Sequence, residues 1–170
     1  MDIVYDYWFG EQLQTVIPTI AEFRKQVLGQ QDQMEQQSLS EEINYLQHYL
    51  DSEAMVIVAN DCGSIVGYAS LISNISAHEN CQMFSYYGDD VLLTEGPLVH
   101  ESYRGQGIGT GLFSELISIC QEKDIEIMLC DPDNLRIAQD NSASEQLIKS
   151  FNFELIDVNK GTIYKRDINL

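Results

Sequence analysis

Basic residues are scarce in this chain of 170 residues. It has 9 Lys and Arg against 27 Asp and Glu, which gives a formal net charge of −18. Nucleic acids and anionic membranes bind proteins through basic patches, so we expect neither as a partner. A cationic partner suits this charge better, although an acidic surface also serves solubility alone.

Long apolar runs and metal-binding patterns are missing as well. No apolar run approaches the ~18 residues of a transmembrane helix, and the first ten residues carry Asp2 and Asp6 but no basic residue, unlike a secretory signal. Four cysteines occur without a Cys-x-x-Cys pair, beside three histidines. We therefore expect a cytoplasmic protein whose cysteines are buried reduced thiols rather than disulfides or zinc ligands.

No lysine lies between Lys25 and Lys123, although a glycine-rich run in that interval is similar to loops that bind phosphate. The run is Arg104-Gly105-Gln106-Gly107-Ile108-Gly109-Thr110-Gly111. A Walker loop needs a lysine after its second glycine, and the dinucleotide fingerprint needs a third glycine where Thr110 or Leu112 stands. Both nucleotide motifs are therefore excluded.

The glycines of this run alternate and lead into an amphipathic helix. Five apolar residues fall on one helical stripe, and we expect this helix to have no glycine of its own: Leu112, Phe113, Leu116, Ile117 and Cys120. Glycine permits positive φ and a close approach of a ligand to backbone N–H groups. At a helix N-terminus these groups favour an anion by about 0.3–1 kcal/mol. The run predicts an anion-binding loop, with a glycine-rich hairpin or helix C-cap without a ligand as the alternative.

The length fits one domain, residues 1–170, of mixed α/β structure. Strands are expected at 3–7, 54–59, 65–72, 91–99 and 125–130, and a closing hairpin at 153–158 and 161–165. Helices are expected at 11–28, 40–50, 112–123 and 142–150. Ser40 is the expected cap of the second helix, and residues 60–63 form the expected turn of the first hairpin. The closing hairpin offers a surface for a homodimer.

The order of these elements and the glycine run resemble the GCN5-related N-acetyltransferase family. Its acyl-CoA signature, Gln/Arg-x-x-Gly-x-Gly/Ala, is matched by Arg104, Gly107 and Gly109, after an apolar strand with a proline near its end. A second family pattern, Asn-x-x-Ala-x-x-Phe-Tyr-x-x-x-Gly-Phe, is in register with residues 141–153. The resemblance implies the acyl-CoA N-acyltransferase fold, which is α/β with a mixed, mostly antiparallel central sheet flanked by helices. It also implies acetyl-CoA as the cofactor.

The resemblance further implies a role for particular residues. The N–H groups of Gln106 to Thr110 would hold the pyrophosphate of coenzyme A. Leu98 and Val99 would pair with the pantetheine arm, and the Val99 N–H would polarise the thioester carbonyl. Asn141 would contact the pantetheine or adenosine side, or cap the helix that follows. The expected cofactor-binding residues are Leu98, Val99, Arg104, Gly105, Gln106, Gly107, Ile108, Gly109, Thr110 and Asn141.

Acetyl transfer to an amine also requires a base. An amine with a pKa near ~10.4 arrives protonated and must lose a proton before it attacks the thioester. Glu95 stands in an otherwise apolar strand, where burial would raise a carboxyl pKa toward neutrality, so we expect it to be the catalytic base. The alternative is an exposed Glu95, or one paired with Arg104. His100 and Glu101 are weaker candidates.

Two positions depart from the family pattern. Ile148 stands where the family often has a tyrosine that protonates the leaving thiolate, and Asn152 replaces a glycine. Asparagine tolerates the left-handed conformation, so the second change is structurally mild. Tyr103, Ser144 and Tyr164 are hydroxyl groups that could take the place of the missing acid.

Two functions are consistent with these residues. The first is an N-acetyltransferase that acts on a primary amine, with a cationic small molecule or a peptide or protein amine favoured by the acidic composition. The second is a non-catalytic acyl-CoA-binding or regulatory module. We expect the acceptor to be selected by residues 30–42 and 75–90, whose aromatic side chains could line a pocket or simply pack.

Overall fold

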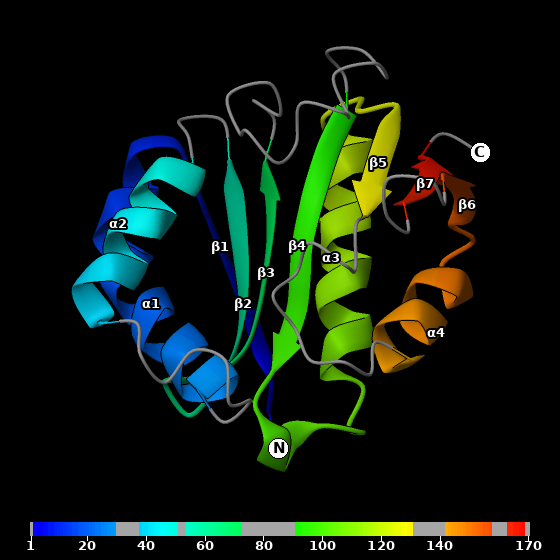
Figure 1. The fold of residues 1–170 in the computed structure, drawn as a ribbon. Helices are drawn as coiled ribbons and strands as arrows, with labels where there is room; N and C mark the ends of the chain where they lie inside the picture. The colour runs from blue at the N-terminus through cyan, green and yellow to red at the C-terminus, as the bar shows by residue number, and fades with distance from the viewer. Residues whose placement is uncertain are drawn as a thin grey trace.

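Seven strands form one sheet, in the order β1-β2-β3-β4-β5-β7-β6 (Figure 1). The computed structural model describes residues 2–29, 38–50, 54–72, 91–130, 142–157 and 163–168. The strands are β1 (Val4–Phe9), β2 (Met55–Asp61), β3 (Ser64–Ile72), β4 (Val91–Val99), β5 (Ile127–Cys130), β6 (Glu154–Asp157) and β7 (Ile163–Asp167). The helices are α1 (Leu13–Gly29), α2 (Leu39–Tyr49), α3 (Ile108–Glu122) and α4 (Ser142–Ser150), with short 3-10 helices η1 (Gly10–Gln12) and η4 (Glu101–Tyr103). Only the β4–β5 pair is parallel among these strands, which confirms the predicted mixed, mostly antiparallel sheet.

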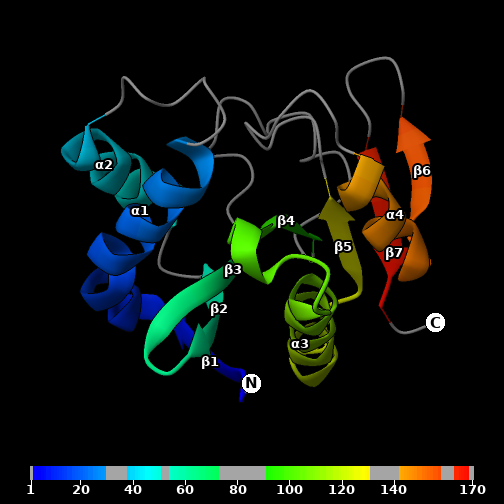
Figure 2. The same cartoon turned by 90° about the horizontal axis from the view of Figure 1, so that it is seen from below.

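Helices cover both faces of the sheet, and the sequence of a central strand reflects this. Figures 1 and 2 show α1 and α2 together on one face and α3 on the other. In β2, Val56 and Val58 belong to the core beside α1 and α2, while Met55, Ile57 and Ala59 belong to the core beside α3. A strand buried on both faces has a continuous apolar sequence, which explains why most of β2 lacks polar alternation.

Helix α2 begins before its predicted start, because its cap is Ser38 rather than Ser40. The Ser38 hydroxyl accepts a hydrogen bond from the Glu41 N–H at 3.2 Å, and the Glu41 carboxylate accepts one from the Ser38 N–H at 2.6 Å. This reciprocal capping box satisfies two N–H groups that the helix itself leaves without an acceptor. The same bonds hold the pKa of Glu41 below its ordinary value.

The cysteines occupy two kinds of environment in the described ranges. Cys120 and Cys130 are buried thiols, as predicted, and burial raises the pKa of Cys120 to about 12. Cys62 is exposed, which corrects the prediction. It lies with Gly63 at the tip of the β2–β3 hairpin, where both residues have positive φ, 51° and 85°, as a two-residue hairpin turn favours. Cys81 lies outside the described residues.

The described ranges contain neither a membrane-spanning helix nor a cluster of metal-binding side chains. No helix there is long and apolar enough to cross a membrane. No group of three or more His, Cys, Asp or Glu side chains there could hold a metal ion.

A charged pair lies inside the core between α1, α2 and β3. The Arg24 Nε donates a hydrogen bond to the Glu42 Oε1 at 2.6 Å, and the two side chains are only 2% and 0% exposed. The guanidinium also lies over the rings of Tyr68 and Tyr45, 5.4 and 5.7 Å from their centroids. Helical periodicity does not single out this pair, because its members lie on different helices. The pair ties both helices to the sheet.

We predict that Glu42→Ala lowers the free energy of unfolding by about 3 kcal/mol, because it leaves the Arg24 charge buried without its carboxylate. The matched control is Glu145→Ala, which removes an exposed i,i+4 pair with Lys149 and costs less than about 0.5 kcal/mol. Urea unfolding followed by circular dichroism measures both changes. A loss at Glu42 no larger than the loss at Glu145 would contradict the stabilising role of the buried pair.

Candidate functional site

Strands β4 and β5 run side by side for only half of β4. Their parallel ladder pairs Val91–Thr94 with Ile127–Cys130, whereas β4 continues to Val99. Over its second half, β4 is paired with β3 alone among the described strands. Beyond Thr94, one edge of β4 therefore has no described strand beside it (Figure 1).

Gly96 lies where β4 loses its regular register with β3. Ser70 pairs with Glu95 and Tyr68 pairs with Leu98, so β4 carries one extra residue between these pairs. Gly96 has a φ of 97°, and a Cβ there would come within 2.9 Å of the Tyr68 carbonyl oxygen. Glycine is therefore required at this position, and the bulge redirects the end of the strand.

The backbone of Val99 faces the open edge of β4. The His100 N–H donates a hydrogen bond to the Val66 carbonyl at 3.0 Å, which makes Gly67 and Val99 a non-hydrogen-bonded pair in the antiparallel ladder. The N–H of Val99 therefore points away from β3, toward the edge of β4 that has no described strand beside it. By the same alternation, Leu98 directs its N–H and carbonyl toward β3.

The first two glycines of the run form the loop that leads to α3. Gly105 and Gly107 adopt positive φ, 72° and 82°, and a Cβ on either residue would meet nothing within 4 Å. Gly107 is the N-cap of α3 and has no side chain that could cap the helix. The first N–H groups of a helix lack intrahelical acceptors and lie at the positive end of its dipole. This uncapped helix start with open space beside it fits an anion such as a pyrophosphate.

The last two glycines of the run pack against neighbouring elements of the fold. Helix α3 begins inside the run, so Gly109 and Gly111 lie in its first turn, which corrects the prediction of a helix without glycine. A Cβ on Gly109 would lie 3.5 Å from Pro97 of β4 and 3.6 Å from Leu147 of α4. A Cβ on Gly111 would overlap the ring of Tyr5 in β1. Gly111 therefore allows the start of α3 to approach β1 closely, whereas a Cβ on Gly109 would make ordinary van der Waals contacts.

Two polar side chains hold the glycine loop in place. The Arg104 Nε donates to the Val99 carbonyl at 3.1 Å, and the Gln106 Nε2 donates to the Ser102 carbonyl at 3.1 Å. Arg104 is exposed, and it is the one Lys or Arg of the sequence between residues 26 and 122. Its positive charge therefore lies where the strand end meets the loop. Two more of the expected cofactor-binding residues lie in the first turn of α3. Ile108 is buried there, and Thr110 is exposed.

The short helix η4 joins the loop to the β2–β3 hairpin. The Tyr103 hydroxyl donates to the Asp61 carboxylate at 3.0 Å, and this bond is the main reason that the pKa of Tyr103 is raised. The His100 Nδ1 caps η4 by accepting from the Ser102 N–H at 3.3 Å. His100, Glu101 and Tyr103, which the sequence offers as base or acid candidates, thus belong to the turn that precedes the glycine loop.

Some candidate side chains lie outside the described part of the chain. The backbone of Glu95 is described and lies opposite Ser70, but its side chain is not among the described ones. Ser70 is buried, and its hydroxyl has no hydrogen-bond partner among the described residues. Asn141 and the side chain of Ser144 also lie outside the described part.

The position of the missing tyrosine is occupied by a core residue. Ile148 is 2% exposed and belongs to the hydrophobic cluster that contains Phe113. Tyr164 is buried in the same cluster, with the Lys149 ammonium 5.8 Å from its ring centroid. Asn152 has a φ of 60°, so asparagine does adopt the left-handed conformation where the family pattern has glycine.

Solved structures share this fold over nearly the whole chain at low sequence identity. An N-acetyltransferase from Staphylococcus aureus Mu50 is 18% identical, with a TM-score of 0.70 and coverage of 99% of both chains. The PaiA N-acetyltransferase from Thermoplasma acidophilum, in complex with coenzyme A, is 18% identical, with a TM-score of 0.60 and coverage of 98% of this chain and 99% of that chain. The ribosomal-protein-alanine N-acetyltransferase from Brucella melitensis is 19% identical, with a TM-score of 0.64 and coverage of 96% and 99%.

The family is established by a comparison of sequence. A search of curated proteins finds no match. The three structures above have less than 25% identity to this chain, so they establish the fold alone. A model of the acetyltransferase (GNAT) family matches residues 20–140, well over half of the 170 residues. The chain therefore belongs to the GNAT acetyltransferase family, whose enzymes use acetyl-CoA.

Proposed function

We propose that this chain transfers an acetyl group from acetyl-CoA to a primary amine, by direct attack of the amine on the thioester. The observation that carries the proposal is the end of β4, whose one edge has no described strand beside it, next to an uncapped, glycine-lined helix N-terminus. An extended arm with a carbonyl at one end and phosphates at the other suits this arrangement. The strand edge offers backbone hydrogen bonds, and the helix start favours the negative charge.

The residues that would hold acetyl-CoA are those of the strand end and the glycine run. When bound, acetyl-CoA supplies a thioester that an amine can attack. The N–H groups of Gln106 to Thr110, with the Arg104 guanidinium, would bind the pyrophosphate. The Val99 N–H, which faces the open edge, donates to the thioester carbonyl. Leu98 shapes the same strand end, and Asn141 is the proposed contact on the far side of the arm.

Glu95 is the proposed catalytic base. A primary amine has a pKa near ~10.4, so it arrives protonated and its nitrogen cannot attack until a proton is removed. Glu95 immediately precedes Gly96 and lies opposite the buried Ser70. Glu95 would accept the first proton of the ammonium group, and the free amine nitrogen would then bond to the acetyl carbon. The nitrogen would lose its second proton to solvent as the carbon–sulfur bond breaks and releases the thiolate of coenzyme A.

Helix α4 supplies no acid at the position of the family tyrosine, because Ile148 has no proton to donate. A thiol has a pKa near ~8.5, so a thiolate is a tolerable leaving group without help. General acid catalysis contributes typically ~10²–10⁴-fold to a rate. We therefore propose a reaction that proceeds without an acid on α4, more slowly than with one, in which solvent protonates the sulfur.

The proposed acceptor is a cationic amine, either of a small molecule or of a peptide or protein. The formal net charge of −18 supports a cation, because a field of one sign raises the local concentration of the opposite sign. A structural relative named as a ribosomal-protein-alanine N-acetyltransferase supports a protein amine. The segments expected to select the acceptor, 30–42 and 75–90, lie mainly outside the described residues. We propose the cytoplasm as the place of this reaction.

A free-thiol assay tests the activity itself. With acetyl-CoA and a panel of small amines and peptide N-termini, we expect sustained thiol release that depends on the amine. The same protein is titrated with acetyl-CoA in a calorimeter. Binding without release for any amine would favour the non-catalytic acyl-CoA-binding module over the enzyme.

Gly107→Glu tests the proposed pyrophosphate site. We expect it to weaken acetyl-CoA binding by at least about tenfold, because it places a carboxylate beside the phosphates. Gly63→Glu is the matched control, since Gly63 also has positive φ, 85°, and equally open space around it. Both variants carry the same charge and a similar backbone strain, so calorimetry separates the site effect from instability. Equal affinity of the two variants for acetyl-CoA would refute the assignment.

Glu95→Gln tests the proposed base. We expect turnover to fall by about 10²–10⁴-fold with little change in acetyl-CoA affinity, because the amide cannot accept the amine proton. Glu101→Gln is the comparison, since Glu101 lies six residues further along in η4 and is the weaker base candidate. Rates are measured from pH 6 to pH 10 with one amine. A wild-type rate of Glu95→Gln across this range would exclude Glu95 as the base.

A further inference from the structure

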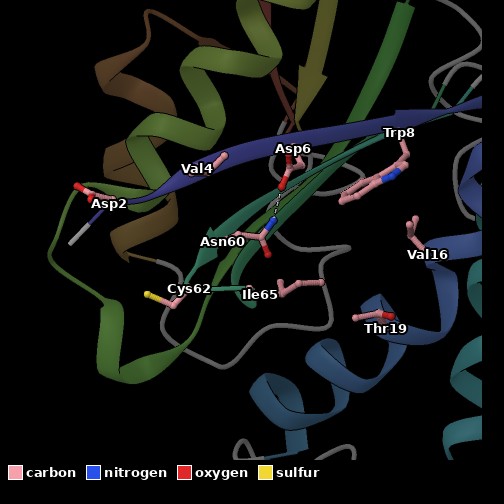
Figure 3. Close-up of a pocket in the computed structure, with 10 residues that line it drawn as sticks. Asp2, Val4, Asp6, Trp8, Val16, Thr19, Asn60, Cys62 and Ile65 are labelled. Carbon is pink, nitrogen blue, oxygen red and sulfur yellow. Dashed lines mark hydrogen bonds between the residues drawn. The ribbon is translucent and has the colours of Figure 1, made fainter.

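A groove of about 580 Å³ lies between α1, β1 and the β2–β3 hairpin (Figure 3). Val4, Asp6 and Trp8 alternate along β1 and line one side of it. Val16 of α1 and Ile65 of β3 line it from other elements. The lining contains no residue of the strand end or the glycine run. This groove is therefore separate from the proposed acetyl-transfer site.

The charged groups of the groove are all acidic. Asp2 and Asp6 line it, and no Lys, Arg or His is among its described lining residues. The Asn60 Nδ2 donates to the Asp6 Oδ2 at 2.6 Å, which orients this carboxylate (Figure 3). Among the described residues, no hydrogen bond is formed to the Asp6 Oδ1, so this oxygen remains available to a ligand. The groove thus presents a fixed acceptor and a second carboxylate.

The rest of the lining is mainly apolar. Val4, Val16 and Ile65 provide aliphatic surface, and Trp8 adds a partly buried indole. An indole ring attracts cations through the negative face of its π system. Apolar surface combined with carboxylates and an indole is complementary to a molecule with a protonated amine and a short hydrocarbon part.

The volume and charge identify the kind of occupant. Small-molecule sites usually measure about 300–1,000 Å³, and this groove falls in that range. A second copy of the chain would bring the same formal charge of −18 to an acidic surface, which disfavours it as the occupant. A small cation instead gains from both the local carboxylates and the charge of the whole chain.

We propose that this groove binds a small amphipathic amine at a site distinct from that of the acetyl acceptor. The ammonium group lies at the Asp6 carboxylate, beside the ring of Trp8, and Asp2 adds a second negative charge further along the groove. The hydrocarbon part lies against Val16 and Ile65. Binding does not require acetyl-CoA, so it can be measured whether or not the proposed transfer occurs.

Trp8 is the one tryptophan of the chain, so its fluorescence reports on the groove directly. Hexylamine is titrated into the full chain without acetyl-CoA, and 1-hexanol and hexanoate serve as uncharged and anionic controls. We expect a saturable change of Trp8 emission with hexylamine and none with the controls. Asp6→Asn should weaken hexylamine binding by about tenfold, because it removes a charged acceptor while keeping an oxygen for Asn60.

Two further variants keep the test decisive. Glu154→Gln removes the same charge from β6, at the opposite edge of the sheet, and should leave hexylamine affinity within about twofold. Thr19→Lys places an ammonium in the groove from the exposed face of α1 and should weaken binding even if Asp6→Asn does not fold. The proposal is overturned if hexylamine leaves the Trp8 emission unchanged, or if it binds Asp6→Asn and Thr19→Lys as tightly as the wild type.

Discussion

The close contact between the first turn of α3 and the sheet is the constraint on which the rest of the site depends. A Cβ on Gly67 of β3 would lie only 2.9 Å from Ile108 and 3.0 Å from Leu112. A Cβ on Gly111 would overlap Tyr5 of β1. Because glycines stand at this contact and have no side chains, the positive end of α3 lies directly beside the end of β4. Interiors are close-packed, so this spacing is set by the backbone and changes little.

Most of the fold could be predicted because its signals are local. Continuous apolar runs, helical stripes and hairpin turns each occupy a short stretch of sequence. The glycine run could also be found, but its glycines could not be sorted by function, because the positive φ of Gly107 and the close packing of Gly111 look alike in a sequence. The Arg24–Glu42 pair and the burial of Ile148 depend on partners far along the chain, and no local pattern reveals such partners.

An anion site in so acidic a chain requires that short-range interactions outweigh long-range ones. At physiological ionic strength, charges more than about 8 Å apart are largely screened. Backbone N–H groups act at hydrogen-bond distance, where screening is slight, and Arg104 lies at the same junction. The many distant carboxylates therefore weaken anion binding less than the net charge of −18 suggests.

Backbone N–H donors are unevenly distributed along the end of β4. Pro97 has no N–H, whereas Val99 directs its N–H to the open edge, and Pro97 lies beside Gly109 at the start of α3. A ligand bound two residues earlier along this edge would meet Pro97 instead of Val99 and would lose its hydrogen-bond donor. Only one position along the edge is therefore favoured. The distance from the Val99 N–H to the start of α3 then sets the length of the arm that fits. We therefore expect an arm of matching length to be favoured, through a backbone group that only a substitution by proline would remove.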